Sequence, residues 1–370
     1  MALTKIRLGD YIYRSTVNNH DLKYGEELIT GVNSQGVFAV PKGSVEGVDL
    51  KPYKIVENGA FVYNPTRLEL GSIAYRTEGM CIVSHLYMVF YLTEEGKKII
   101  DPIWLYIYFR RKEFCREVTF RNFGSQRPEF NFNDMSDIIV PLPPIETQQK
   151  FVDIYKAMVA NQQSYERGLE DLKLVCDAYI EDLRRNNPSQ KIGKFISRHD
   201  VRNGSNGTKN VMGISTTKEF REPTSKVNRN ELSNYKVVKP RQFGFVQTTH
   251  NEKVFTYAFN NTTDDIVISS VNEVFSCDEQ YLLPEYLCMF FNRTEFDRYA
   301  RFHSWGSARE TFTWIDLIEV KIPVPQIDIQ RSIADIYIVY KDRKSINEQL
   351  KKQIKSICPI LIKGSLVEGK

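Results

Sequence analysis

The sequence predicts an α+β protein of two similar mixed α/β modules, each followed by a long helix, with the two helices paired as an antiparallel coiled coil. Three observations predict this pseudo-twofold architecture. The 370-residue chain repeats itself at a fixed interval. Each repeat passes in the same order from short β-rich segments to helix-like segments. Each then ends in a long stretch whose apolar residues recur every three or four positions.

The repeat is most evident between residues 101–155 and 283–337. A shift of 182 residues aligns these segments without a gap, and 20 of the 55 pairs are identical. Chance would give roughly three identities, so the chain contains a duplicated unit. The same shift relates YKIV at 53–56 to YKVV at 235–238. A period of this length excludes a solenoid and indicates a duplicated domain.

Each unit begins with short β-rich segments bounded by turn residues, for example 59–63. One helix is expected next, over 103–118 in the first copy and 286–302 in the second. After a Gly-Ser loop, a short apolar strand follows at 138–141 and at 320–323. The prolines that end this strand are expected to stop the sheet and to open a helix.

The first long helix is expected over 146–186, where Gly168 is the only glycine and proline is absent. Gly168 costs about 1 kcal/mol of helix stability and suggests a close approach of two helices. The predicted seam consists of Tyr155, Met158, Gln162, Tyr165, Leu169, Leu172, Cys176, Tyr179 and Leu183.

The second long helix, expected over 326–366, is less regular. Its stripe comprises Ile346, Leu350, Ile354 and Ile357, and Pro359 is expected to end it. A helix with one apolar stripe must bury that stripe, so each helix is the expected partner of the other. A pair of about 40 residues would span about 60 Å. The two modules are then expected over 1–145 and 187–325.

The composition is that of an ordinary globular protein, with 42% hydrophobic and 26% charged residues. No apolar run approaches the roughly 20 residues of a membrane span, and the first residues lack an apolar signal core. A cytoplasmic protein without membrane partners is therefore expected. The six cysteines form no C-x-x-C pair and are expected to be reduced core residues.

The net charge of +4 is distributed unevenly. Residues 187–253 contain 13 Lys and Arg against 5 Asp and Glu, and residues 110–127 contain six against two. Such basic stretches fit contact with a polyanion, although a solvated surface can have the same composition.

Two segments invite a catalytic interpretation. The segment 64–67 (Asn-Pro-Thr-Arg) is similar to the Asn-Pro-Pro-aromatic motif of amino-methyltransferases, but Arg67 replaces the aromatic ring that would stack on a flipped base. Asp316, Glu319 and Lys321 could be nuclease metal ligands, but the first copy has isoleucine in place of the lysine. The sequence therefore predicts no catalytic residue, no metal and no cofactor.

The same loop is better suited to DNA contact. Asn, Gln, Thr and Arg pair with base edges and phosphates, and the loops 64–67 and 246–249 are rich in them. Gly-Ser loops at 124–127 and 306–309 could bind phosphate, or their arginines could pair with nearby carboxylates. The candidate DNA contacts are Asn64, Thr66, Arg67, Arg121, Ser125, Arg127, Gln247, Thr248, Thr249, Ser307 and Arg309.

The entrance to each long helix carries a related motif. Residues 141–148 are Pro-Leu-Pro-Pro-Ile-Glu-Thr-Gln and residues 323–330 are Pro-Val-Pro-Gln-Ile-Asp-Ile-Gln, with Gln326 in place of Pro144. Together with the duplication, this resembles the specificity (S) subunit of type I restriction-modification systems.

The resemblance implies that each module is a target recognition domain that reads one half of a split, asymmetric sequence in double-stranded DNA. It also implies that the helices set the gap between the half-sites and dock two methyltransferase (M) subunits, that restriction (R) subunits join this core, and that the S subunit itself is not an enzyme. The alternative left open is a coiled-coil interaction scaffold without sequence-specific DNA binding.

Overall fold

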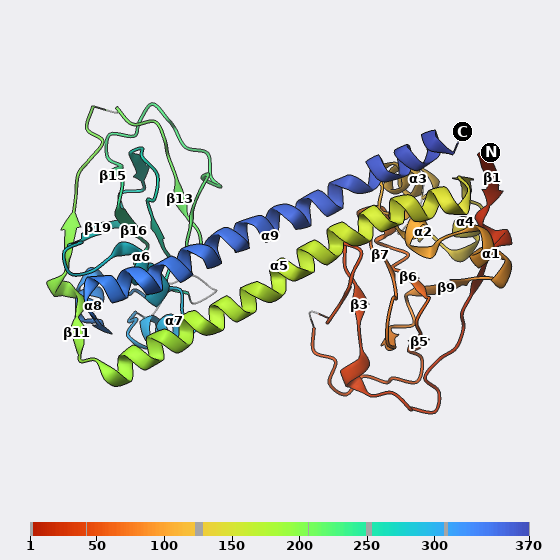
Figure 1. Ribbon diagram of the computed structural model, residues 1–370, viewed down its shortest axis with the longest axis horizontal. Helices are drawn as coiled ribbons and strands as arrows, with labels where there is room; N and C mark the ends of the chain where they lie inside the picture. Colours follow the sequence, from red (N-terminus) through yellow and green to blue (C-terminus); the bar gives the residue numbers. More distant parts are fainter. Residues whose placement is uncertain are drawn as a thin grey trace. The chain divides into compact units, whose positions relative to one another are not determined.

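The structure, a computed structural model, describes residues 3–41, 43–122, 129–205, 207–248, 254–306 and 310–369. The chain divides into two compact units. Unit 1 comprises Met1–Ser164 and Asn347–Lys370, and unit 2 comprises Tyr165–Ile346. The two long helices, α5 (Ile145–Asn186) and α9 (Ile327–Glu368), each contribute to both units (Figure 1).

Unit 1 is built on a four-stranded antiparallel sheet in the order β2-β9-β6-β7. Its strands are β2 (Ile12–Arg14), β9 (Met88–Leu92), β6 (Phe61–Tyr63) and β7 (Ile73–Tyr75). Three further antiparallel pairs are β1 (Thr4–Arg7) with β10 (Ile139–Leu142), β3 (Gly31–Val32) with β4 (Phe38–Ala39), and β5 (Lys54–Val56) with β8 (Cys81–Val83).

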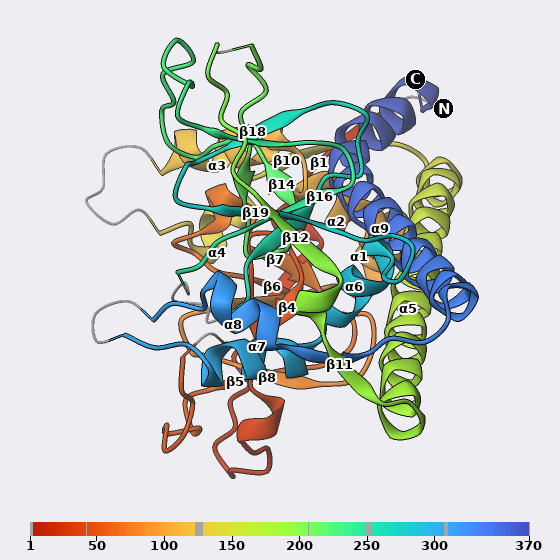
Figure 2. The same ribbon diagram turned by 90° about the vertical axis from the view of Figure 1, so that its left-hand side faces the viewer.

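Unit 2 has the same topology. Its sheet has the order β12-β19-β16-β17, from β12 (Ile196–His199), β19 (Glu273–Cys277), β16 (Gln242–Phe245) and β17 (Tyr257–Phe259) (Figure 2). The smaller pairs are β11 (Ser189–Lys191) with β20 (Lys321–Pro323), β13 (Gly213–Ile214) with β14 (Phe220–Arg221), and β15 (Lys236–Val238) with β18 (Ile266–Ile268). The predicted duplication is thus confirmed strand by strand.

The helices also correspond, but the prediction of one helix over 103–118 and one over 286–302 is wrong. Each region forms two helices, α2 (Pro102–Phe109) with α3 (Lys112–Arg121), and α6 (Pro284–Phe291) with α7 (Thr294–Phe302). The break occurs because Arg111 and Arg293 adopt extended backbone angles at the N-caps of α3 and α7. The turn lets both helices of each pair bury aromatic residues in one core.

The remaining helices are short. They are α1 (Glu94–Ile99), α4 (Phe132–Ser136) and α8 (Trp314–Glu319), with single 3-10 turns η1 (Leu8–Asp10), η2 (Glu26–Leu28), η3 (Leu68–Leu70) and η4 (Ile192–Lys194). Gly9 in η1 and Gly193 in η4 lie against α4 and α8. A Cβ atom at Gly9 would approach Ser136 Cβ to 2.6 Å, and one at Gly193 would approach Ile318 Cβ to 2.8 Å. This close contact explains the glycine at the same place in both copies.

Each core includes part of the long helix that follows the other module. In unit 1, Cys358, Leu361 and Ile362 of α9 join the module's aromatic core, and in unit 2 Cys176, Ile180 and Leu183 of α5 do so. The prediction that Pro359 ends the second helix is therefore wrong. Proline inside a helix costs about 3 kcal/mol, but burying Leu361 and Ile362 beyond it contributes about 1.5–3 kcal/mol each.

Within each unit, α5 and α9 run antiparallel, as predicted. In unit 1, Lys150 Nζ lies 2.5 Å from Glu368 Oε1, and Gln162 Nε2 donates to Asn347 Oδ1 at 2.9 Å. In unit 2, the predicted close approach at Gly168 is confirmed, because a Cβ there would lie 2.8 Å from the Arg343 guanidinium.

The seam differs from the prediction at two positions. Tyr179 is 46% exposed and Ile346 is 39% exposed, whereas their neighbours Ile180 and Asn347 are buried. Ile180 is buried because this part of α5 packs on the core of unit 2 rather than following a heptad repeat. Asn347 is buried because it accepts the hydrogen bond from Gln162, and such a buried polar pair fixes the register of paired helices.

The proline-rich motif at each helix entrance is explained by its glutamine. Gln148 is fully buried, its Oε1 accepts from the backbone N–H of Asp101 at 2.8 Å, and its Nε2 donates to the carbonyls of Ile99 and Pro143, both at 2.8 Å. We call this arrangement the glutamine clasp. It ties the first turns of α5 to the segment between α1 and α2.

Gln330 makes the same clasp in unit 2. It accepts from the N–H of Leu283 at 2.9 Å and donates to the carbonyls of Tyr281 at 2.7 Å and Pro325 at 2.8 Å. All six cysteines are free thiols, of which Cys81, Cys176, Cys288 and Cys358 are buried. In the described part of the chain, no helix combines the length and the apolar character needed to span a membrane.

Candidate DNA-contact surface

The first candidate loop follows β6 in unit 1. Asn64 Oδ1 accepts hydrogen bonds from the backbone N–H of Thr66 at 3.1 Å and from Thr66 Oγ1 at 2.9 Å. Such a local turn is typical of asparagine. It leaves Thr66 and Arg67 exposed, while Asn64 is half-buried and shapes the loop.

Each candidate loop is joined to the segment that follows the Gly-Ser loop of its own unit. The carbonyl of Pro65 accepts from the N–H of Phe130 at 3.0 Å, and the carbonyl of Gln247 accepts from the N–H of Phe312 at 2.8 Å. Both partners are separated by the repeat interval of 182 residues. The structure therefore brings together, in both units, two regions that the sequence proposed separately.

Several candidates are less clearly placed. Thr248 pairs with Thr311 in an isolated antiparallel bridge. Arg121 forms an ion pair with Glu117 at 3.0 Å and is 31% exposed, so this arginine already has a carboxylate partner. Five candidates lie outside the described residues and stay predictions: Ser125, Arg127, Thr249, Ser307 and Arg309.

Gln247 belongs to a charged network that sequence reasoning missed. Its Nε2 donates to Glu273 Oε1 at 3.1 Å. Glu273 is only 4% exposed, and it also accepts two bonds from Arg198, at 2.9 and 2.7 Å, and one from Lys236 at 3.2 Å. A buried carboxylate needs such donors to offset its lost hydration. Because a carboxylate only accepts, the Gln247 amide must turn its nitrogen toward Glu273.

The network joins residues far apart in the sequence, so no local motif could reveal it. The signal available was Glu273 itself, a charged residue at the start of the apolar strand segment Glu-Val-Phe. A buried glutamate in a strand implies cationic partners.

Unit 1 has a different charge arrangement at the same place. The strand registers put Arg14 and Met88 where unit 2 has Arg198 and Glu273. Arg14 is exposed, and no carboxylate among the described residues forms an ion pair with it.

Lys54 lies close to Arg14 and corresponds to Lys236. It is buried, and its Nζ donates to the carbonyl of Tyr87 at 2.5 Å. Burial lowers the pKa of Lys54, and the charge of Arg14 lowers it further. The described carboxylates thus neutralise this region in unit 2 but not in unit 1.

The basic stretch 187–253 is less positive in the fold than in the sequence. Carboxylates from other segments, including Glu273, Glu279 and Asp297, neutralise many of its cations. The cations in ion pairs are Lys191, Arg198, Arg202, Lys218, Arg229, Lys236 and Arg241.

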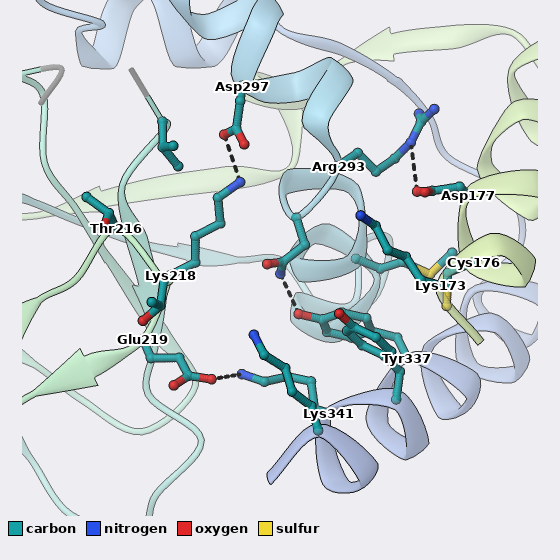
Figure 3. A pocket seen from close by; sticks show the side chains of 16 residues that line it. Lys173, Cys176, Asp177, Thr216, Lys218, Glu219, Arg293, Asp297, Tyr337 and Lys341 are labelled. Atoms are coloured by element: carbon teal, nitrogen blue, oxygen red, sulfur yellow. Dashed lines mark hydrogen bonds and ion pairs between the residues drawn. The ribbon is translucent and has the colours of Figure 1, made fainter. Parts of the chain in front are cut away.

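A cavity of about 260 Å³ in unit 2 is lined by several charged side chains (Figure 3). Lys218 Nζ donates to the carbonyl of Phe291 at 2.7 Å and to Asp297 at 2.8 Å, and burial lowers the pKa of Lys218. Lys341 lies 3.5 Å from Glu219. These pairs connect the β13–β14 hairpin to α7 and α9, so we assign them a structural role.

The residues considered for catalysis also have structural roles. Asp316 forms the capping box of α8 with Thr313, and Asp134 forms the same box at α4 with Asn131. Glu319 pairs with Lys191 at 2.5 Å beside the β11–β20 pair. Within the described ranges, no cluster of His, Cys, Asp and Glu side chains could hold a metal ion.

Comparison with known proteins identifies the family. The family model described as "Type I restriction modification DNA specificity domain" matches residues 6–172. The chain carries a type I restriction-modification DNA specificity domain. Its second module repeats the topology of the matched one and much of its sequence, and the resemblance inferred from the proline-rich motifs is confirmed.

Solved structures agree in fold. A type I restriction-modification S subunit from M. genitalium matches with a TM-score of 0.60 and 9% identity, over 99% of this chain and 96% of that one. The HsdS subunit from Thermoanaerobacter tengcongensis matches with a TM-score of 0.41 and 15% identity, over 99% and 96% of the two chains. No curated protein matches the sequence.

Proposed function

We propose that this chain is the DNA-recognition subunit of a type I restriction-modification enzyme and that it performs no chemistry itself. Residues 1–145 and 187–325 would act as target recognition domains, each reading one half of a bipartite, asymmetric target. The helices 146–186 and 326–366 would set the gap and help to dock two M subunits, and R subunits would join this core. The observation that carries the proposal is the specificity-domain match over 6–172 together with its duplication.

The clasps and the strand pairs beside them support a rigid reader. Gln148 and Gln330 fix each module to the start of its helix, and β1–β10 and β11–β20 close each module at that same place. A reader whose modules are fixed to paired helices holds two half-sites at a set distance, as dimeric DNA-binding proteins do.

The charge arrangement supports different half-sites for the two modules. Gln247, oriented by Glu273, and Arg67 with Thr66 are side chains able to contact base edges or phosphates, and they differ between the copies. Replacing residues 197–311 with the same region of a relative should change one half of the methylated motif. Methylome sequencing of the host would show this, and a change in both halves would contradict independent reading.

The helix pair offers a second test. Inserting seven residues after Ser164 and seven after Ile346 keeps a heptad register and lengthens both helices by about 10 Å. At about 3.4 Å per base pair, the unspecified spacer should widen by about three base pairs while both half-sites stay the same. An unchanged spacer in a fully active variant would contradict the ruler. A salt-titrated gel shift separates the reader from a scaffold that does not bind DNA.

A further inference from the structure

Helices α3 and α7 present the same three side chains to solvent. Glu113, Arg116 and Phe120 lie on α3, and Glu295, Arg298 and Phe302 lie at the repeated positions on α7. The spacing of three and four residues places each trio on one side of its helix. We call each trio the Glu-Arg-Phe face.

The geometry of the two faces is the same. Arg116 NH2 lies 3.3 Å from Glu113 Oε1, and Arg298 NH2 lies 3.1 Å from Glu295 Oε1. Phe120 is 82% exposed and Phe302 is 79% exposed. Two phenylalanines this exposed at matching positions are unlike the aromatic residues of either core.

Stability does not account for this identity. Among the identical described pairs of 101–155 and 283–337, four are exposed in both copies, and three of these form the Glu-Arg-Phe faces. The fourth is Asp153 with Asp335. An exposed ion pair between helical neighbours contributes about 0.3–0.5 kcal/mol, and an exposed phenylalanine buries little apolar area. Surface residues free of such a demand would diverge, as most of their neighbours have.

A face present in both modules must meet something that is the same at both. Base contacts are excluded, because the half-sites of an asymmetric target differ. A DNA backbone is also disfavoured, because Glu113 and Glu295 would face phosphate and already neutralise the neighbouring arginines. An exposed aromatic residue beside a charge pair is instead typical of an anchor in a protein interface.

The surface beside the face in unit 1 fits such an anchor. A cavity of about 480 Å³ runs between α3 and η3, lined among others by Arg116, Thr119 and the exposed Leu70. A side chain of a bound protein could fill it next to Phe120.

We propose that each Glu-Arg-Phe face docks one M subunit, so that the partner is held by the module as well as by the long helices. This inference rests on the proposed function, which supplies a protein partner in two equal copies. Phe120 and Phe302 would insert into an apolar pocket of the M subunit, and the glutamate and arginine would form a charged rim around it.

The test uses the full chain and the M subunit of the same host. Phe120→Ala, Phe302→Ala and the double variant are compared with Ile315→Ala, which removes an equally exposed apolar residue, 71% exposed, that the first copy lacks. Native mass spectrometry and sedimentation give the number of M subunits bound per chain.

Each single variant should weaken one of two M sites by about tenfold or more, and the double variant should weaken both. Ile315→Ala should bind as the wild type does. DNA affinity of the isolated chain, measured at several salt concentrations, should be unchanged in all variants.

Other outcomes overturn the inference. If the double variant binds two M subunits normally and loses DNA affinity, the face contacts DNA. If it loses only self-association of the chain, the partner is a second copy. A wild-type chain that binds DNA specifically but no M subunit would remove the proposed partner, whereas failure of both M and DNA binding would contradict the proposed function itself.

Discussion

The two modules are nearly identical where they meet the helices and different where a target would be read. The glutamine clasp is repeated bond for bond, with backbone partners that differ by 182 residues. At the end of the sheet, Glu273 binds Arg198 in unit 2, while Met88 accompanies an Arg14 that forms no ion pair with the described residues of unit 1. Duplication has thus kept the attachment constant and has allowed the contact surface to change.

The largest expected effect is the loss of a clasp. Gln148→Leu and Gln330→Leu each leave one backbone N–H and two carbonyls without their buried partner. At about 1–3 kcal/mol for each unsatisfied group, each variant should lose about 3–5 kcal/mol of unfolding free energy. Denaturant unfolding measures this loss, and hydrogen exchange should locate it at the start of α5 for Gln148→Leu and of α9 for Gln330→Leu.

The neighbouring residue provides a control. Gln149 is exposed and has the same side chain, so Gln149→Leu should change stability by less than about 0.5 kcal/mol. If Gln148→Leu and Gln330→Leu differed greatly from each other, the two attachments would not be equivalent.

A second prediction concerns an arginine that is identical in sequence but not in environment. Arg293 is buried and pairs with Glu181 and with Asp177, 3.5 Å away. Arg111, its counterpart, lies over the Tyr108 ring at 3.7 Å. Because Glu181 and Asp177 are partly exposed, Arg293→Met should cost about 2 kcal/mol, against about 1 kcal/mol for Arg111→Met. Equal costs in denaturant unfolding would contradict this difference.

The arginine pair shows what the sequence could and could not predict. The repeat, the strand order and the antiparallel helices followed from periodicity and identity, because these depend on local patterns. The environment of Arg293 depends on acidic residues more than 100 positions away, and the network of Glu273 on partners 26 to 75 positions away. Pro359 and Tyr179 were misassigned because tertiary burial, rather than local preference, decides where α9 ends and which side of α5 is covered.

A third prediction tests the sheet end itself. Glu273→Gln keeps the shape of the side chain but removes the charge that holds Arg198 and Lys236. We expect a loss of about 1–2 kcal/mol of stability from weakened charge-assisted bonds. Nonspecific DNA affinity should rise at low salt, and the slope of log K against log salt should steepen by about one.

Glu222→Gln is the matched control, because it removes one negative charge from the same unit at an exposed pair with Arg229. It should leave stability unchanged. If both variants changed DNA affinity equally, net charge rather than the position of Glu273 would be responsible.

The smallest expected effect lies in the helix pair, at Gly168. Alanine should stabilise a helix by about 1 kcal/mol relative to glycine, but its Cβ would meet the Arg343 guanidinium, which lies over the Tyr165 ring at 4.9 Å. Displacing a flexible arginine from an exposed aromatic ring costs about 0.5–1 kcal/mol. Gly168→Ala should therefore change the unfolding free energy by less than about 0.5 kcal/mol, because these two effects oppose each other. In an Arg343→Ala background the steric conflict is gone, so the same substitution should stabilise the chain by about 1 kcal/mol. A double-mutant cycle in denaturant measures the difference, and equal effects in both backgrounds would show that Gly168 is not there to accommodate Arg343.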